Sequence, residues 1–181
     1  MNQLWIFGYA SLMWRPGFSF AERRRARLVG YHRSLCIRSF EHRGTRERPG
    51  LVMGLDRGGA CVGVAFRVAP DDEANVMAYL RARELITHVY KERRSRIILS
   101  DGQAAEAVTY VADRGHEQYA GRLGVDEAID RVCGAVGEAG PNEDYVLNTA
   151  AHMREMGIRD RWIEAVADGI RQRLNLRSAA P

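Results

Sequence analysis

The sequence lacks the features that mark membrane and secreted proteins. Apolar residues make up 46% of its 181 residues, but the longest uninterrupted apolar runs are only a few residues long. A helix needs roughly 20 consecutive apolar residues to span a bilayer. The first residues also carry no positively charged segment of the kind that opens a secretory signal peptide. We therefore expect a cytoplasmic protein with no membrane partner.

Cysteine is scarce, and histidine forms no metal-binding pattern. The three cysteines Cys36, Cys61 and Cys133 are odd in number and show no CxxC spacing. This argues against both a disulfide framework and a zinc site, and favours three small core residues. No HxH or HExxH motif occurs, so a metal site would have to assemble from distant positions. We expect no metal ion.

Lysine is nearly absent. Lys91 is the single lysine among 27 basic residues, which oppose 23 acidic ones and give a net charge of +4. The 26 arginines raise the question of a polyanionic partner, since guanidinium groups bind phosphates and carboxylates through paired hydrogen bonds. No RNA-binding signature or zinc-finger spacing accompanies them. We therefore expect no nucleic-acid partner; the alternative is an arginine-rich nucleic-acid-binding module whose affinity falls steeply with salt.

Strand patterns fill the first part of the chain. Alternating or continuous apolar residues predict strands at residues 4–7, 28–37, 50–55, 60–68, 89–99 and 104–112. An arginine-rich loop is expected between the first two. The stretches Asp56–Gly59 and Ser100–Gly102 have the composition of hairpin turns.

Helical patterns follow. Pro70 and Asp71 open a helix that runs to about Leu85, and everything from Val125 onward is expected to be helical. Three helices are predicted there, over Asp126–Val136, Glu143–Met156 and Arg161–Leu174. This order of elements indicates an α+β fold with a sheet or a small closed barrel, whose mouth would offer a pocket. We expect one domain over residues 1–181, with a helical tail from about residue 125.

The segment Phe7–Leu12 is the first candidate site. A strand there runs into small residues, and such a turn can point successive backbone N–H groups at a carboxylate or a developing oxyanion. Glycine and serine are also common in ordinary strand-to-loop turns. Both interpretations stay open on the pattern alone.

Glu84 is the second candidate. Met77, Leu80 and Glu84 are spaced three and four residues apart, which places a carboxylate on the apolar face of a helix. Burial would raise its pKa toward neutrality, as a general base requires. The alternative is a structural ion pair between Glu84 and one of the many arginines.

The third candidate is the loop from His42 to Gly50, which carries four charged side chains next to a predicted strand. Arginine in such a loop can bind a carboxylate of a ligand through two hydrogen bonds. A solvated surface loop has the same composition, so the loop alone does not decide between them.

Taken together, these segments resemble the ChaC family of glutathione-specific γ-glutamylcyclotransferases. The resemblance lies in FGYASLMW, HRGTRERPG, CVGVAF and YLRAREL, in that order, and continues through VADRGHEQYAGRL and GPNEDYVLNTAAHMREMGIRD. It covers almost the whole chain. Its strongest element is the FGYGSL-like motif combined with the downstream Arg-Glu dipeptide. Three positions differ from the family pattern: Ala10 stands in place of a glycine, Arg46 of a proline and Val62 of a tryptophan.

The resemblance implies a γ-glutamylcyclotransferase-like fold, a small mixed β-barrel with flanking α-helices. It implies a lyase that needs no cofactor and cleaves glutathione to 5-oxoproline and cysteinylglycine. Glu84 matches the catalytic glutamate that acts as general acid and base. The residues that match substrate-binding positions are Phe7, Gly8, Tyr9, Ala10, Ser11, Leu12, Arg43 and Tyr110. Cyclisation of other γ-glutamyl amides or amines remains the alternative activity.

Overall fold

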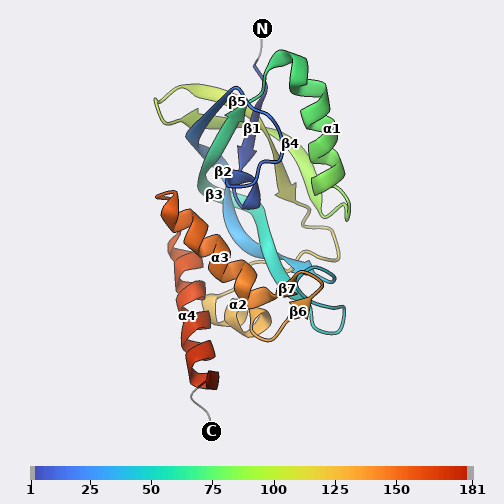
Figure 1. Cartoon of the computed structure of the whole chain (residues 1–181), viewed down its shortest axis with the longest axis vertical. Helices are drawn as coiled ribbons and strands as arrows, with labels where there is room; N and C mark the ends of the chain where they lie inside the picture. The colour runs from blue at the N-terminus through green and yellow to red at the C-terminus, as the bar shows by residue number, and fades with distance from the viewer. Residues whose placement is uncertain (1–2, 179–181) are drawn as a thin grey trace. The chain divides into compact units, whose positions relative to one another are not determined.

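The computed structural model describes residues 3–178, which include a closed five-stranded barrel (Figure 1). The strands follow the order β1-β3-β2-β4-β5. Strand β1 is antiparallel to β3 and parallel to β5, so the barrel is mixed, as predicted. The strands are β1 (Trp5–Gly8), β2 (Glu22–Ser39), β3 (Gly50–Arg67), β4 (Tyr90–Leu99) and β5 (Ala104–Ala112).

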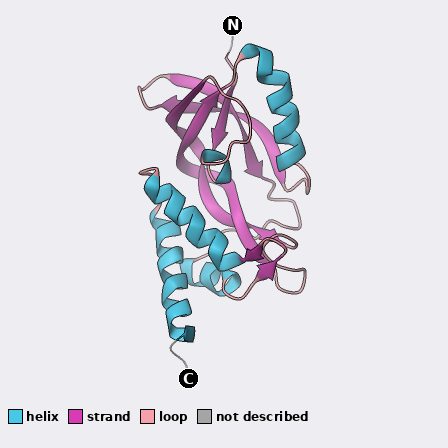
Figure 2. Cartoon of the chain, viewed as in Figure 1, coloured by secondary structure: helices cyan, strands magenta, loops and turns pink. Residues whose placement is uncertain are grey.

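Helices complete the predicted α+β fold (Figure 2). They comprise the short 3-10 turns η1 (Ser11–Met13) and η2 (Pro70–Asp72), and the helices α1 (Glu73–Glu84), α2 (Val125–Val132), α3 (Asn142–Glu155) and α4 (Arg161–Ser178). The chain forms two compact units, one of residues 3–33 and 54–119, the other of residues 34–53 and 120–178. In the first unit α1 lies beside the barrel strands, and in the second α4 packs against α2 and α3 (Figure 1).

The predicted arginine-rich loop before β2 is in part wrong, because the strand begins already at Glu22. Burial alternates along this segment: Arg23, Arg25 and Arg27 are exposed, while Ala26 and Leu28 are buried. Alternate side chains of a strand point to opposite faces. The arginines therefore occupy the outward positions of a strand whose other face contributes to the core.

The predicted hairpin turn at residues 56–59 is also wrong, since β3 runs through it without a break. The Asp56 carboxylate is buried and accepts hydrogen bonds from Arg114 Nε at 2.7 Å and from Tyr119 Oη at 2.8 Å. Gly58 and Gly59 have φ angles of 98° and 70°, which glycine adopts without steric cost. Glycine inside a strand often marks an irregularity of that strand. The second predicted hairpin, β4–β5, is confirmed.

The region after residue 125 is not entirely helical. Helix α2 ends at Val132, and a short hairpin follows, formed by β6 (Val136–Gly137) and β7 (Gly140–Pro141). Helix α3 closes near Gly157 as predicted, and α4 extends beyond the predicted Leu174. The predicted helix over Asp126–Val136 is therefore too long at its C-terminal end, whereas the two later helices lie where they were predicted.

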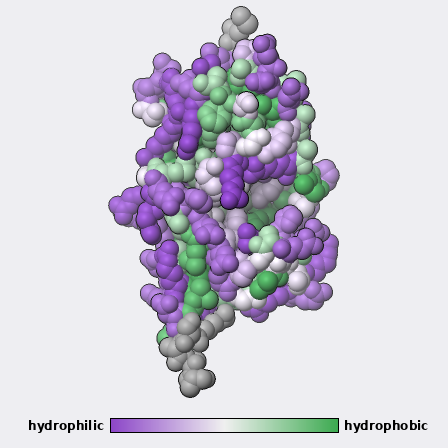
Figure 3. Space-filling view, viewed as in Figure 1, coloured by the Kyte–Doolittle hydropathy of each residue, from purple (hydrophilic) through white to green (hydrophobic). Residues whose placement is uncertain are grey.

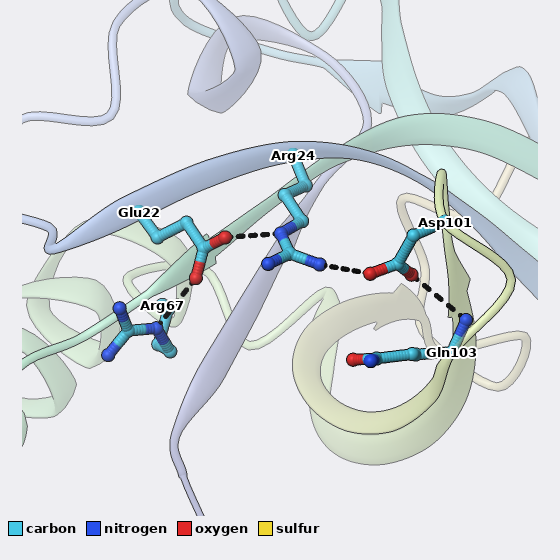
Figure 4. Close-up of polar contacts among 5 residues, drawn as sticks. All are labelled: Glu22, Arg24, Arg67, Asp101 and Gln103. Atoms are coloured by element: carbon cyan, nitrogen blue, oxygen red, sulfur yellow. Dashed lines mark hydrogen bonds and ion pairs between the residues drawn. The ribbon is translucent and has the colours of Figure 1, made fainter.

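Several arginines are used in ion pairs at one end of the barrel (Figure 4). Arg24 on β2 binds both Glu22 and Asp101. Glu22 also accepts a hydrogen bond from Arg67 Nε on β3 at 2.8 Å. This chain of charges joins β2, β3 and the β4–β5 turn. On the face drawn in Figure 3, hydrophilic residues surround smaller hydrophobic areas.

The core contains all three cysteines. Cys36, Cys61 and Cys133 are all buried, which confirms that they are core residues. Among residues 3–178, no helix is long and apolar enough to cross a membrane. The same described part of the chain contains no cluster of three His, Cys, Asp or Glu side chains arranged to hold a metal ion.

Candidate active site

A tight turn at the end of β1 forms the first part of the site. Phe7 and Gly8 are buried in β1, and Tyr9 is buried directly after it. A Cβ atom on Gly8 would lie 3.0 Å from Leu12 Cβ, so glycine allows the 3-10 turn η1 to fold closely against the strand end. Ala10 has a φ of −137°. This φ lies outside the left-handed region that favours glycine, so it does not require the glycine that the family pattern has at this position.

The 3-10 turn presents backbone N–H groups. Met13 N donates to Ala10 O at 2.8 Å and is the first donor within the turn. The N–H groups of Ser11 and Leu12 precede it, in the part of a helical turn where N–H groups have no acceptor inside the helix. Successive N–H groups of this kind form a concave anion-binding surface. We call residues 9–12 the cradle.

A buried arginine holds the cradle against the barrel. Arg33 on β2 donates from Nε to Tyr9 O at 2.5 Å and from Nη2 to Val62 O at 2.7 Å. Arg33 is only 5% exposed. Because a buried guanidinium requires acceptors, these carbonyl contacts fix the backbone at Tyr9 relative to β3.

Glu84 is the last residue of α1, and its side chain is 17% exposed. Val76 and Leu80 form the buried inward face of α1, and Glu84 continues this face, whereas the predicted Met77 is only half-buried. Burial raises the pKa of the Glu84 carboxyl above its ordinary value, and the neighbouring charge of Arg83 partly opposes this. A carboxylate at a helix C-terminus is further disfavoured by the helix dipole.

Arg83 connects Glu84 to the cradle. Its Nε lies 3.2 Å from Glu84 Oε1, and its Nη2 donates to Ser11 Oγ at 3.1 Å. The structure therefore brings together two of the predicted segments, the turn at Ser11 and the helix end at Glu84. The sequence patterns did not identify Arg83 as a contact residue, although the Arg-Glu dipeptide was the available signal.

Tyr110 lies in the same unit and is 1% exposed. Burial, together with the negative charges of Glu92 and Glu84, raises the pKa of the Tyr110 phenol, so it stays protonated near neutral pH. Tyr110 on β5 is directly opposite Glu92 on β4. The structure thus links the predicted Tyr110 electrostatically to the predicted Glu84.

Glu92 has an environment opposite to that of Glu84. Arg81 binds it through Nε at 2.8 Å and Nη2 at 2.9 Å. These hydrogen bonds are the largest cause of a lowered Glu92 pKa. The sequence patterns did not identify Glu92 and Arg81, because their pairing depends on how α1 packs on β4.

Arg43 belongs to the second unit. Its Nη1 donates to Pro141 O at 3.1 Å, and its guanidinium carbon lies 5.5 Å from the centroid of the Tyr145 ring. The backbone N–H of Arg43 donates to Ser39 Oγ at 3.0 Å. These contacts order the loop at residues 42–50. Binding of a substrate carboxylate by Arg43 remains a prediction.

The chain is similar to known proteins in sequence and in structure. The family model described as ChaC-like protein matches residues 4–173. The glutathione-specific gamma-glutamylcyclotransferase of Escherichia coli strain K12 is 32% identical over 157 residues, which cover 87% of this chain and 68% of that protein. The human glutathione-specific gamma-glutamylcyclotransferase 1 is 31% identical over 173 residues, covering 92% of this chain and 78% of the human protein.

The structural comparison agrees with the predicted fold. A crystal structure of a selenomethionine-labelled γ-glutamyl cyclotransferase specific to glutathione, from yeast, superposes with a TM-score of 0.84 at 19% identity. The match covers 95% of this chain and 97% of the yeast chain. It confirms the γ-glutamylcyclotransferase-like fold.

Proposed function

The chain belongs to the ChaC-like family, and from this premise we propose that it is a glutathione-specific γ-glutamylcyclotransferase, a lyase that releases 5-oxoproline and cysteinylglycine. The observation that carries the proposal is the mostly buried Glu84 carboxyl, which Arg83 links to the cradle residue Ser11. A carboxylate with a raised pKa, joined in this way to a turn that presents backbone donors, suits a reaction that moves a proton and develops an oxyanion.

Glu84 is the proposed base. The α-amine of the γ-glutamyl group is mostly protonated at neutral pH, since such amines have a pKa of roughly 8 or above. Only the neutral amine can attack, so a carboxylate has to accept its proton. The raised pKa of Glu84 brings its proton affinity closer to that of the amine. The same carboxyl then returns the proton to the departing cysteinylglycine nitrogen.

Ring closure occurs within one substrate molecule. The α-nitrogen bonds to the γ-carbonyl carbon, and the bond from that carbon to the cysteinyl nitrogen breaks. Holding the substrate in a curled conformation supplies much of the acceleration, because well-oriented intramolecular attack has a large effective molarity. Because the attacking and leaving groups both belong to the substrate, the reaction requires no side-chain nucleophile. We propose that no cofactor takes part.

The cradle is the proposed site for the tetrahedral oxyanion. Backbone N–H groups of residues 10–12 would donate to it. Tyr110 stays protonated, since its pKa is raised by burial and by nearby carboxylates, and its hydroxyl donates to Glu92 Oε2 at 3.5 Å. Phe7 and Gly8 shape the strand end below the cradle. From the family resemblance, we propose that Arg43 binds a carboxylate group of the substrate.

Substrate preference separates this proposal from cyclisation of other γ-glutamyl compounds. We expect kcat/KM for glutathione to exceed that for γ-glutamyl dipeptides by at least about tenfold, which corresponds to roughly 1.4 kcal/mol of differential transition-state binding. The assay measures 5-oxoproline released from reduced glutathione, oxidised glutathione and γ-glutamyl dipeptides. Equal or better cyclisation of the dipeptides would contradict glutathione specificity and favour the broader activity.

A further inference from the structure

We propose that Arg83 is a positioning residue that holds the base Glu84 and the cradle in one geometry. The inference rests on the proposed function and extends it to a residue with no role in the proposed proton transfer. Arg83 does not need to touch the substrate for this role, because it acts through Glu84 and through the segment that follows the cradle.

All three guanidinium nitrogens of Arg83 make contacts. Nη1 donates to Arg15 O at 3.0 Å, to Pro16 O at 3.3 Å and to Tyr79 Oη at 3.0 Å. Nη2 donates to Ser11 Oγ, and Nε faces the Glu84 carboxylate. The rigid planar fork of arginine can satisfy acceptors in several directions at once, whereas a lysine ammonium is a compact point charge. The position therefore requires arginine specifically.

The segment that Arg83 holds is also attached to α1 by aromatic contacts. Phe18 packs edge-on against Tyr79, with ring centroids 6.4 Å apart, and against Phe66 at 5.7 Å. Tyr79 in turn accepts a hydrogen bond from Arg83. Residues 11–18 are thus fixed to one side of α1. A change at Arg83 releases the end of this segment that adjoins the cradle while the aromatic contacts remain.

The electrostatics of Glu84 give Arg83 a second effect. The charged or titratable groups that act on Glu84 or its near neighbours are Arg83 on α1, Tyr110 on β5, and the pair of Glu92 on β4 with Arg81. Arg81 is committed to Glu92 through two hydrogen bonds. Arg83 is the cation in contact with Glu84 itself. Removing it leaves burial unopposed and favours the protonated carboxyl.

The test uses three variants of the full chain. Arg83→Gln removes the charge and most of the contacts, Arg83→Lys retains a positive charge, and Arg131→Gln removes a half-buried helical arginine paired with Glu127. For each variant, kcat and KM with glutathione are measured as a function of pH. The Glu84 carboxyl is titrated separately by ¹³C NMR, with its signal assigned by its absence in Glu84→Gln.

We expect Arg83→Gln to lower kcat/KM by about 10- to 100-fold, because small displacements of positioned groups have effects of this size. The acidic limb of its kcat profile and its Glu84 titration should both move to higher pH. Arg83→Lys should keep the limb near that of the wild type but raise KM, because lysine cannot span the contacts from Ser11 to Pro16. Arg131→Gln should match the wild type.

An unchanged acidic limb and an unchanged Glu84 titration in folded Arg83→Gln would overturn the proposal. Wild-type kinetics in Arg83→Lys would overturn it as well, which covers the case in which Arg83→Gln fails to fold. The NMR titration needs no turnover. Absence of 5-oxoproline release by the wild type would therefore refute the proposed function, while the titration still decides whether Arg83 controls Glu84.

Discussion

Replacing Glu84 by Gln is expected to reduce kcat for 5-oxoproline release by roughly 10²- to 10⁴-fold, the range in which a general acid–base residue contributes. Glutamine preserves the size of the side chain but cannot accept the ammonium proton. Binding of glutathione should change less than turnover, since the loss concerns the transition state. The measurement is kcat and KM with glutathione, with Glu127→Gln, an exposed helical carboxylate, as the matched control.

The same variant has a stability signature that shows the fold is intact. Burial raises the folded-state pKa of Glu84 above its ordinary value of 4.5, so the folded protein binds this proton more tightly than the unfolded chain. Its favourable contribution is complete below the ordinary pKa and is lost as the pH rises through the folded-state pKa. Glu84→Gln should therefore melt higher than the wild type at pH 7 but not at pH 4. Near-normal turnover in this folded variant would remove Glu84 from catalysis.

The second large effect is expected for Gly63→Ala, where β3 passes the end of β1. A Cβ atom at this position would lie 2.3 Å from Gly8 O and 2.7 Å from Phe7 Cζ. Backbone atoms cannot give way cheaply at such distances, so β1 has to shift at the point where the cradle begins. We expect a loss of about 1–3 kcal/mol in the free energy of unfolding, as for overpacked cores, together with lower kcat/KM.

Gly115→Ala is the control for Gly63→Ala. It adds the same methyl group in the same unit, where the nearest atom, Asp113 Oδ1, would lie at an ordinary 3.5 Å. Chemical denaturation and glutathione turnover are measured for both variants. If Gly63→Ala and Gly115→Ala behave alike, the close approach of β3 to the cradle has no bearing on stability or activity.

Much of the fold was predictable because local patterns and packing agree. The β4–β5 hairpin, α1 and the end of α3 follow directly from alternation, helix spacing and turn composition. The prediction of a turn at residues 56–59 was wrong because two glycines and an aspartate, taken in isolation, suit a turn as well as they suit an irregular strand. The Asp56 side chain instead binds Arg114 and Tyr119, more than fifty residues later, and no local pattern contains that information.

In the site, too, features that follow from local spacing could be predicted, whereas contacts between distant segments could not. Spacing placed Glu84 on the inward face of α1, and its burial confirms that part. The partners that adjust its surroundings were missed, because Arg83 reaches Ser11 across 72 positions of sequence and Glu92 meets Arg81 only through the packing of α1 on β4. Part of the abundance of arginine has a structural explanation. Defined partners within the fold are bound by four of these residues, Arg24, Arg33, Arg81 and Arg83.

The most direct test of the account is the fate of oxygen when the wild-type protein cleaves glutathione in H₂¹⁸O. Attack by the substrate's own α-amine predicts 5-oxoproline and cysteinylglycine in equal amounts, with no ¹⁸O in the 5-oxoproline, and no reaction with N-acetylated glutathione. Mass spectrometry of the products gives both answers. Release of ¹⁸O-labelled glutamate, or turnover of the N-acetylated substrate, would contradict intramolecular cyclisation.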